Sequence, residues 1–173
     1  VIGNSDITRV YMAQDAGATV YCGGLNIGGS AFSLNNLNDV LIENNSLFLG
    51  TVPSSTSGAA NNVSVGINAL ESITTGDANI AIGRQALKSS TTASSNTAVG
   101  YNSMYSIDSG GTNTAIGSNS LYTLVSSHQN VAIGYGALYN TTGDSNTAVG
   151  YEAGKSNTSG TYNTSVGRHA NKT

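Results

Sequence analysis

One pentapeptide recurs seven times along the last two thirds of the 173-residue chain, and its even spacing constrains the fold more than any other feature. Each copy begins with asparagine and ends with glycine, as in NIAIG at 79–83 and NTAIG at 113–117. Successive asparagines stand 17 residues apart, except for one step of 16. Self-similarity at a fixed period is the signature of units that stack on one another. The sequence therefore predicts a rod built from successive coils.

We number the positions of each coil from its asparagine, which is position 0. Coils 1 to 7 begin at Asn62, Asn79, Asn96, Asn113, Asn130, Asn146 and Asn163. When the coils stack in register, these side chains should form an amide ladder or hydrogen-bond the backbone of a turn. We interpret them as structural residues rather than as ligands of a bound molecule.

Positions 1 to 3 alternate in size with the period of two that a β-strand requires. Positions 1 and 3 are always Val, Ile or Thr, whereas position 2 is always Ala or Ser. Stacked coils should cover one another's apolar side chains, so that Val and Ile form one buried ladder. The face of small residues would then be open to close approach by a neighbouring backbone.

Position 4 is glycine in every coil: Gly66, Gly83, Gly100, Gly117, Gly134, Gly150 and Gly167. A residue without Cβ after a strand predicts a turn with positive φ, or a corner where a second backbone passes close. A large apolar residue stands at position 8 in the first five coils, as in Leu70 and Leu121, and should form a second ladder. Gly154 and Asn171 replace it in the last two coils, which suggests a junction there.

The chain divides into three regions on this pattern, and the predicted class is all-β: a parallel β-roll or solenoid of 17-residue rungs. Residues 1–45 are expected to be an irregular β region, with β-prone stretches within 7–34 and a connector at 34–44 that could include one helical turn. Residues 46–60 would hold a degenerate eighth rung, SLFLG at 46–50, and a linker. Residues 61–173 would be the seven-repeat solenoid.

Such a coil makes a thin core. Only two or three apolar side chains per coil are larger than alanine, which is little burial to oppose the lost entropy of about 17 ordered residues. Association through the alanine face would add burial, and several identical chains wound about one axis would supply it. The energetics therefore predict a homo-oligomer.

The repeats NTAVGY and NIAIGR, over residues 61–171, resemble the head repeats of trimeric autotransporter adhesins and still more the arrays of phage tail-fibre proteins. The resemblance implies a left-handed parallel β-roll, a homotrimer, and attachment to a host cell-surface glycan or protein receptor outside the cell. The repeats are longer than is usual in adhesin heads, and the chain shows no coiled-coil heptads and no membrane anchor. These departures favour the shaft of a virion tail fibre over a bacterial surface adhesin head.

The composition argues against several other functions. The net charge is -3 with only six Lys and Arg, so no basic patch is expected to hold nucleic acid. No apolar run is long enough for membrane insertion, and no cofactor, metal site or enzyme activity is predicted. Asp77 and Asp144 share the motif TTGD but fall four coils apart, too far to act as a catalytic pair, and each is expected to form an Asx turn that caps its loop.

Tyrosine is the one residue type with a periodic placement that suggests recognition. Six of the nine tyrosines fall at position 5 or position 9: Tyr101, Tyr135, Tyr151, Tyr105, Tyr122 and Tyr139. As outward columns they are candidate glycan contacts; alternatively, they cover the edges of the apolar ladders or pack between chains. A monomeric solenoid that binds a glycan or an ice surface is a further alternative, although position 1 mixes Thr with Val and Ile.

Overall fold

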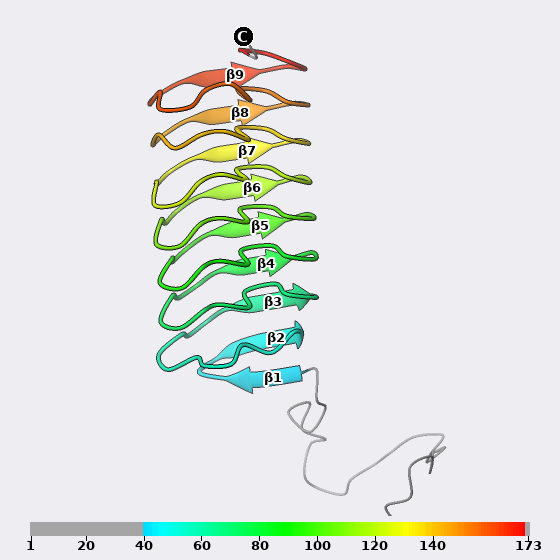
Figure 1. Ribbon diagram of the computed structural model, residues 1–173, viewed down its shortest axis with the longest axis vertical. Helices are drawn as coiled ribbons and strands as arrows, with labels where there is room; N and C mark the ends of the chain where they lie inside the picture. The colour runs from blue at the N-terminus through cyan, green and yellow to red at the C-terminus, as the bar shows by residue number, and fades with distance from the viewer. Residues whose placement is uncertain (1–39, 172–173) are drawn as a thin grey trace, which may run out of the picture. The chain divides into compact units, whose positions relative to one another are not determined.

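The computed structural model describes residues 40–171, and within that range the protein is an all-β solenoid with no helix (Figure 1). Nine strands form a single sheet in chain order, from β1 to β9. The strands are β1 (Val40–Glu43), β2 (Ser46–Gly50), β3 (Val63–Gly66), β4 (Ile80–Ile82), β5 (Thr97–Val99), β6 (Thr114–Ile116), β7 (Val131–Ile133), β8 (Thr147–Val149) and β9 (Thr164–Val166). The prediction of an all-β solenoid with 17-residue rungs is confirmed. The β-prone stretches within 7–34 lie outside the described residues.

The register of the sheet places equivalent repeat residues directly opposite one another. Strands β2 to β9 are parallel, and Ala81 pairs with Ala98, which is the partner of Ala115 in the next coil. Backbone hydrogen bonds also join successive coils outside the strands, as from Leu70 N to Ala86 O at 3.1 Å. The 17-residue period in the sequence is thus the period of the stack.

The chain enters the sheet through a hairpin that the sequence analysis did not predict. Strand β1 pairs with β2 in antiparallel register, from Val40 opposite Leu49 to Glu43 opposite Ser46. Asn44 and Asn45 connect them with φ of 47° and 59°, as in the two-residue turns that match the twist of a hairpin. The connector with a helical turn expected for 34–44 is therefore wrong for residues 40–43, which form a strand.

Strand β2 occupies the place of a coil that precedes coil 1. Gly50 pairs with the corner glycine Gly66, and Ser46 stands at position 0 in place of asparagine. Phe48 stands at position 2 and is fully buried. Because this rung has serine rather than leucine at position 8, a larger residue on the strand fills the end of the core.

The strands point the opposite way from the prediction, because position 2 faces the interior and positions 1 and 3 face outward. The small residues at position 2 are buried in every coil: Ser64, Ala81, Ala98, Ala115, Ala132, Ala148 and Ser165. In contrast, Val65, Ile82 and Ile116 at position 3 remain 37–41% exposed. The prediction that the Val and Ile ladder is buried is therefore wrong.

The larger core residues come from the segment that returns from the end of one strand to the start of the next. Leu70, Leu87, Met104, Leu121 and Leu138 at position 8 are buried, as are Ile73, Ile107 and Leu124 at position 11. The return segment therefore provides the large side chains that fill the interior. Small residues on the strand allow these side chains to pack against the sheet.

An unusual backbone conformation directs the position 8 side chains inward. From Leu70 to Leu138 their φ values are 48–51°, the left-handed region that costs a non-glycine residue about 1–2 kcal/mol. Full burial of a Leu or Met side chain contributes about 1.5–3 kcal/mol. Burial therefore offsets the backbone cost in each coil.

Glycine at position 4 is required for two reasons at once. Its φ lies between 118° and 141° in coils 1 to 7, a conformation that L side chains rarely adopt. A Cβ added at Gly117 would also lie 2.5 Å from the carbonyl oxygen of Gly134 in the next coil. The corner thus combines the turn and the close backbone approach that the sequence suggested as alternatives.

Candidate functional site

The seven asparagines line up in one column and form the amide ladder expected from the repeat. In the first six, the side-chain Oδ1 accepts hydrogen bonds from the backbone N–H and the Nδ2 of the asparagine in the next coil, for example from Asn113 to Asn96 at 3.0 Å for both. Nδ2 of Asn96 also donates to Gly110 O at 2.9 Å, which ties the start of the coil to its end. At the first coil, Ser46 Oγ replaces the amide and accepts the Asn62 N–H at 2.9 Å.

This ladder lies inside the protein rather than on a binding surface. The six asparagines from Asn62 to Asn146 are fully buried, and Asn163 at the last coil is half-buried. Their hydrogen-bonding groups are used within the chain, so they are not available to a ligand. The ladder holds successive coils in register.

The tyrosines at position 9 form a continuous stacked column. Tyr105 and Tyr122 have ring centroids 5.2 Å apart, and Tyr122 and Tyr139 are 5.0 Å apart with nearly parallel planes. Lysine ammonium groups cover both ends, with Lys88 5.6 Å from the Tyr105 ring and Lys155 5.8 Å from the Tyr139 ring. Burial in this column, and then the neighbouring tyrosines, raise the pKa of Tyr122.

The tyrosines at position 5 form a second column with larger exposed surfaces. Tyr101, Tyr135 and Tyr151 are 45–48% exposed. Tyr135 stacks on Tyr151 at 5.2 Å, and the guanidinium groups of Arg168 and Arg84 lie over Tyr151 and Tyr101 at 5.8 and 5.7 Å. All six candidate glycan contacts therefore have an aromatic ring or a cationic group of an adjacent coil beside them, but only the position 5 tyrosines are nearly half exposed as residues.

Asp77, His128 and Asp144 belong to another column, at the turn that precedes the asparagine. Asp77 Oδ1 accepts the N–H of Ala60 at 2.7 Å, and Asp144 Oδ1 accepts the N–H of His128 at 2.8 Å. His128 Nδ1 in turn accepts the N–H of Gly111 at 3.1 Å. These acceptors bind the backbone of the preceding coil, whereas the sequence analysis expected each aspartate to cap its own loop.

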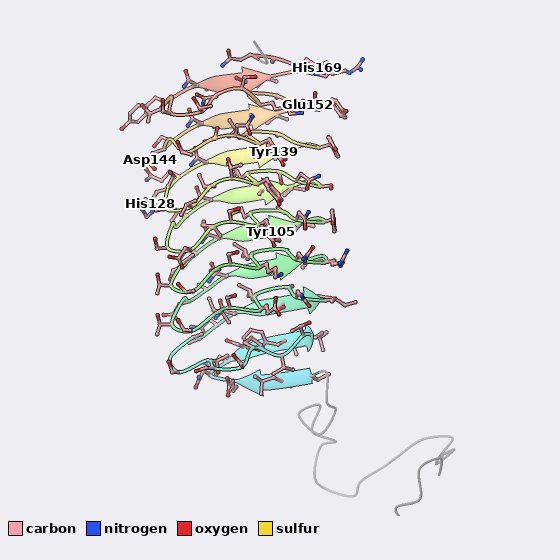
Figure 2. All side chains as sticks on the ribbon, in the orientation of Figure 1. Tyr105, His128, Tyr139, Asp144, Glu152 and His169 are labelled. Atoms are coloured by element: carbon pink, nitrogen blue, oxygen red, sulfur yellow. The ribbon has the colours of Figure 1, made fainter. Side chains whose placement is uncertain are left out.

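A charged cluster at the end of the stack was missed by the sequence analysis. Glu152, nearly buried at position 6, contacts Lys155 Nζ, and its Oε2 lies 3.3 Å from Nδ1 of His169 in the next coil. Hydrogen bonding to Glu152 raises the pKa of Lys155. The sequence signal for this contact was that Glu152 and His169 both stand at position 6, in consecutive coils. Figure 2 shows Glu152 and His169 near the ends of the strands, with His128 and Asp144 at the opposite edge.

Residues 40–171 contain no group of three His, Cys, Asp or Glu side chains arranged to hold a metal ion. The same range contains no helix that is long and apolar enough to cross a membrane. Most of the exposed large apolar side chains of these residues lie on the outward face of the strands or in the position 5 tyrosine column.

Comparison with known proteins gives no relative from which a function could be transferred. The chain matches no family model, and neither a curated protein nor a solved structure matches it at a significant level.

Proposed function

We propose that this chain is a structural and adhesive fibre segment, the shaft of a virus tail fibre, which acts as an extracellular homotrimer in attachment to a host cell surface. The observation that supports this most is the outward face of the parallel sheet. Positions 1 and 3 present a stripe of β-branched side chains on β3 to β9, including Ile80, Ile82, Ile116 and Ile133 at 38–41% exposure, and β2 extends it with two leucines. We call these two columns the outward stripe.

The outward stripe has the dimensions of an interaction surface. Seven steps of about 4.8 Å separate β2 from β9, which gives a length of about 34 Å, and two side-chain columns are about 10 Å wide. An area of about 340 Å² equals that of the largest apolar patch on a typical monomeric protein, and such patches are often functional. Three identical chains that bury their stripes against one another would add apolar burial to the thin core of each chain. The contact face in this proposal is the β-branched face, not the alanine face that the sequence suggested.

The stack suits a shaft because each coil is held to the next on several sides. Strand pairing, the asparagine ladder and the stacked tyrosines all join neighbouring coils. A rod with three equivalent chains would also present any receptor contact three times, which multiplies weak affinities into strong attachment. The receptor in this proposal is a cell-surface glycan or protein.

Sedimentation of the purified chain tests the assembly. A homotrimer has a mass of three times 17.5 kDa, about 52 kDa. Introducing charge into the stripe with Ile116→Lys and Ile133→Lys should yield monomers, because the ammonium groups would be buried without partners. Val125→Lys is the matched control, since Val125 is 50% exposed but lies in the return segment. A wild-type mass of 17.5 kDa would refute the trimer.

A bacterial surface adhesin head is the alternative assembly with the same fold. If the chain is an adhesin head, labelled wild-type protein should bind the tissue cells that a bacterium colonises and should not bind bacteria. If it is a tail fibre, the labelled protein should bind bacteria. Binding to neither would contradict both forms of the attachment proposal.

A monomeric ice-binding solenoid is a second candidate from a different class. The observation in its favour is that Thr97, Thr114 and Thr147 stand at position 1, on the outward face of a regular sheet. The Val and Ile residues of the same column count against it. Inhibition of ice recrystallisation by a monomer would favour this function over the fibre.

A further inference from the structure

The position 5 column follows a simple rule: side chains in neighbouring coils cover one another. The Arg84 guanidinium lies over the ring of Tyr101, Tyr135 stacks on Tyr151, and Arg168 lies over Tyr151. Each of these contacts joins adjacent coils. Tyr151, which has a large position 5 side chain in both neighbouring coils, therefore contacts a tyrosine ring in one and a guanidinium group in the other.

Ser118 interrupts this rule in coil 4. It stands between Tyr101 in coil 3 and Tyr135 in coil 5. The backbone is not interrupted there, because Asn119 N donates to Tyr101 O at 2.9 Å and Gly136 N donates to Ser118 O at 3.0 Å. The coils keep their normal spacing, and only the side chain is too small to fill its layer of the column.

The missing layer has the thickness of one ring. Neighbouring tyrosines in this protein stack with centroids 5.0–5.2 Å apart, so Tyr101 and Tyr135, two coils apart, are separated by about 10 Å. A ring placed midway would lie about 5 Å from each tyrosine, within the distance range of favourable stacking. The position 9 column has no equivalent gap, since Tyr105, Tyr122 and Tyr139 follow one another without interruption.

We propose that the gap over Ser118, between the rings of Tyr101 and Tyr135, binds one pyranose ring of a glycan. We call this gap the Ser118 slot. The assignment rests on the proposed attachment function and deepens it, because it names the class of receptor and the residues that contact it.

The polar groups around the slot favour a sugar over a purely apolar ring. Ser118 Oγ accepts a hydrogen bond from Asn119 Nδ2 at 3.3 Å, and Asn119 Oδ1 accepts one from Asn102 Nδ2 at 3.3 Å. Two aromatic walls with hydroxyl and amide groups at one edge match a ring that has apolar faces and hydroxyls on its rim.

Saturation-transfer NMR on the assembled full chain tests the slot. The probes are the methyl pyranosides of glucose, galactose, mannose and N-acetylglucosamine, each measured separately at millimolar concentration. We expect at least one of them to receive saturation at its ring C–H protons. Ser118→Tyr should lower that signal at least fivefold, because the introduced ring occupies the gap. The fold should tolerate the change, since three other coils have tyrosine at position 5.

Two further variants keep the test decisive. Ser126→Tyr adds the same side chain at an exposed residue of the return segment, and should leave binding unchanged. Tyr101→Ala removes one wall and should weaken binding even if Ser118→Tyr fails to fold. The slot is refuted if none of the four sugars receives saturation, or if binding survives in both Ser118→Tyr and Tyr101→Ala. Neither result would alter the sedimentation mass, so a failed slot is distinguishable from a failed fibre.

Discussion

Removal of one amide from the middle of the asparagine ladder should destabilise the protein strongly. Asn96 Oδ1 accepts two hydrogen bonds from Asn113, and Asn96 Nδ2 donates to Gly110 O. Asn96→Ala therefore leaves the buried N–H of Asn113 and the carbonyl of Gly110 without these partners. Each unsatisfied buried group costs about 1–3 kcal/mol, so the loss of both partners should lower the free energy of unfolding by about 2–6 kcal/mol.

Chemical denaturation followed by circular dichroism measures this loss, with all variants at one protein concentration because association contributes to stability. Asn163→Ala is the matched control. Asn163 ends the ladder, is only half-buried, and donates its Nδ2 to Asn146 Oδ1 at 3.1 Å without a further ladder amide beyond it in the described residues. Its removal should cost about 1 kcal/mol. Equal losses for the two variants would refute the argument that the ladder is cooperative and buried.

Three other predictions follow from single residues. Gly117→Ala should lower the free energy of unfolding by at least about 3 kcal/mol, because the φ of residue 117 is 136° and the added Cβ would meet the carbonyl of Gly134. Gly58→Ala, whose added Cβ would meet only an ordinary contact, is the control in the same denaturation assay. Ser90→Ala should raise the free energy of unfolding by about 1 kcal/mol, since Ser90 Oγ is buried without a hydrogen-bond partner among the described residues; a loss of stability would contradict this. Because the pKa of Tyr122 is raised in the folded state, its contribution to stability is fully present below the ordinary tyrosine pKa of about 10 and is lost as the pH rises through the folded-state value. Thermal melts at alkaline pH should therefore show a smaller loss of stability in Tyr122→Phe than in the wild type. Equal losses of stability in the two proteins would contradict the assignment.

The sequence predicted most of what depends on the period. The asparagine column, the corner glycines and the strand register all repeat with the coil, so their stacking follows from the sequence alone. The rung at Ser46–Gly50 was visible for the same reason, because Gly50 precedes Gly66 by nearly one period. Periodicity is robust evidence when a residue must meet its own counterpart in the next coil.

The direction of the strand faces could not be read from alternation alone. A period of two shows that position 2 and position 3 lie on opposite faces, but not which face is inside. The expectation that Val and Ile are buried failed because Leu70 and its equivalents already fill a narrow interior. The threonines at position 1 were the sequence signal that this face points outward, since a hydroxyl group fits a solvent-facing surface.

The other errors involve features without a repeat. The turn at Asn44 and Asn45 makes β1 part of the sheet, and no other coil has such a hairpin to reveal it. The contact between Glu152 and His169 depends on one pair of coils. Left-handed φ at Leu138 and its equivalents was also unexpected, because leucine rarely adopts it without burial to offset the cost.

The central claim is that equivalent residues lie one coil apart along a column, and electron–electron distances between spin labels test it most directly. Thr92→Cys with Ser159→Cys, and Thr75→Cys with Ser159→Cys, place labels on exposed position 13 residues four and five coils apart. Cys22 is replaced by serine, and labelled chains are diluted with unlabelled ones so that only distances within a chain are seen. The account predicts mean distances of about 19 Å and about 24 Å, an increase of one strand spacing per coil. Distances that do not increase from the first pair to the second would contradict the stack.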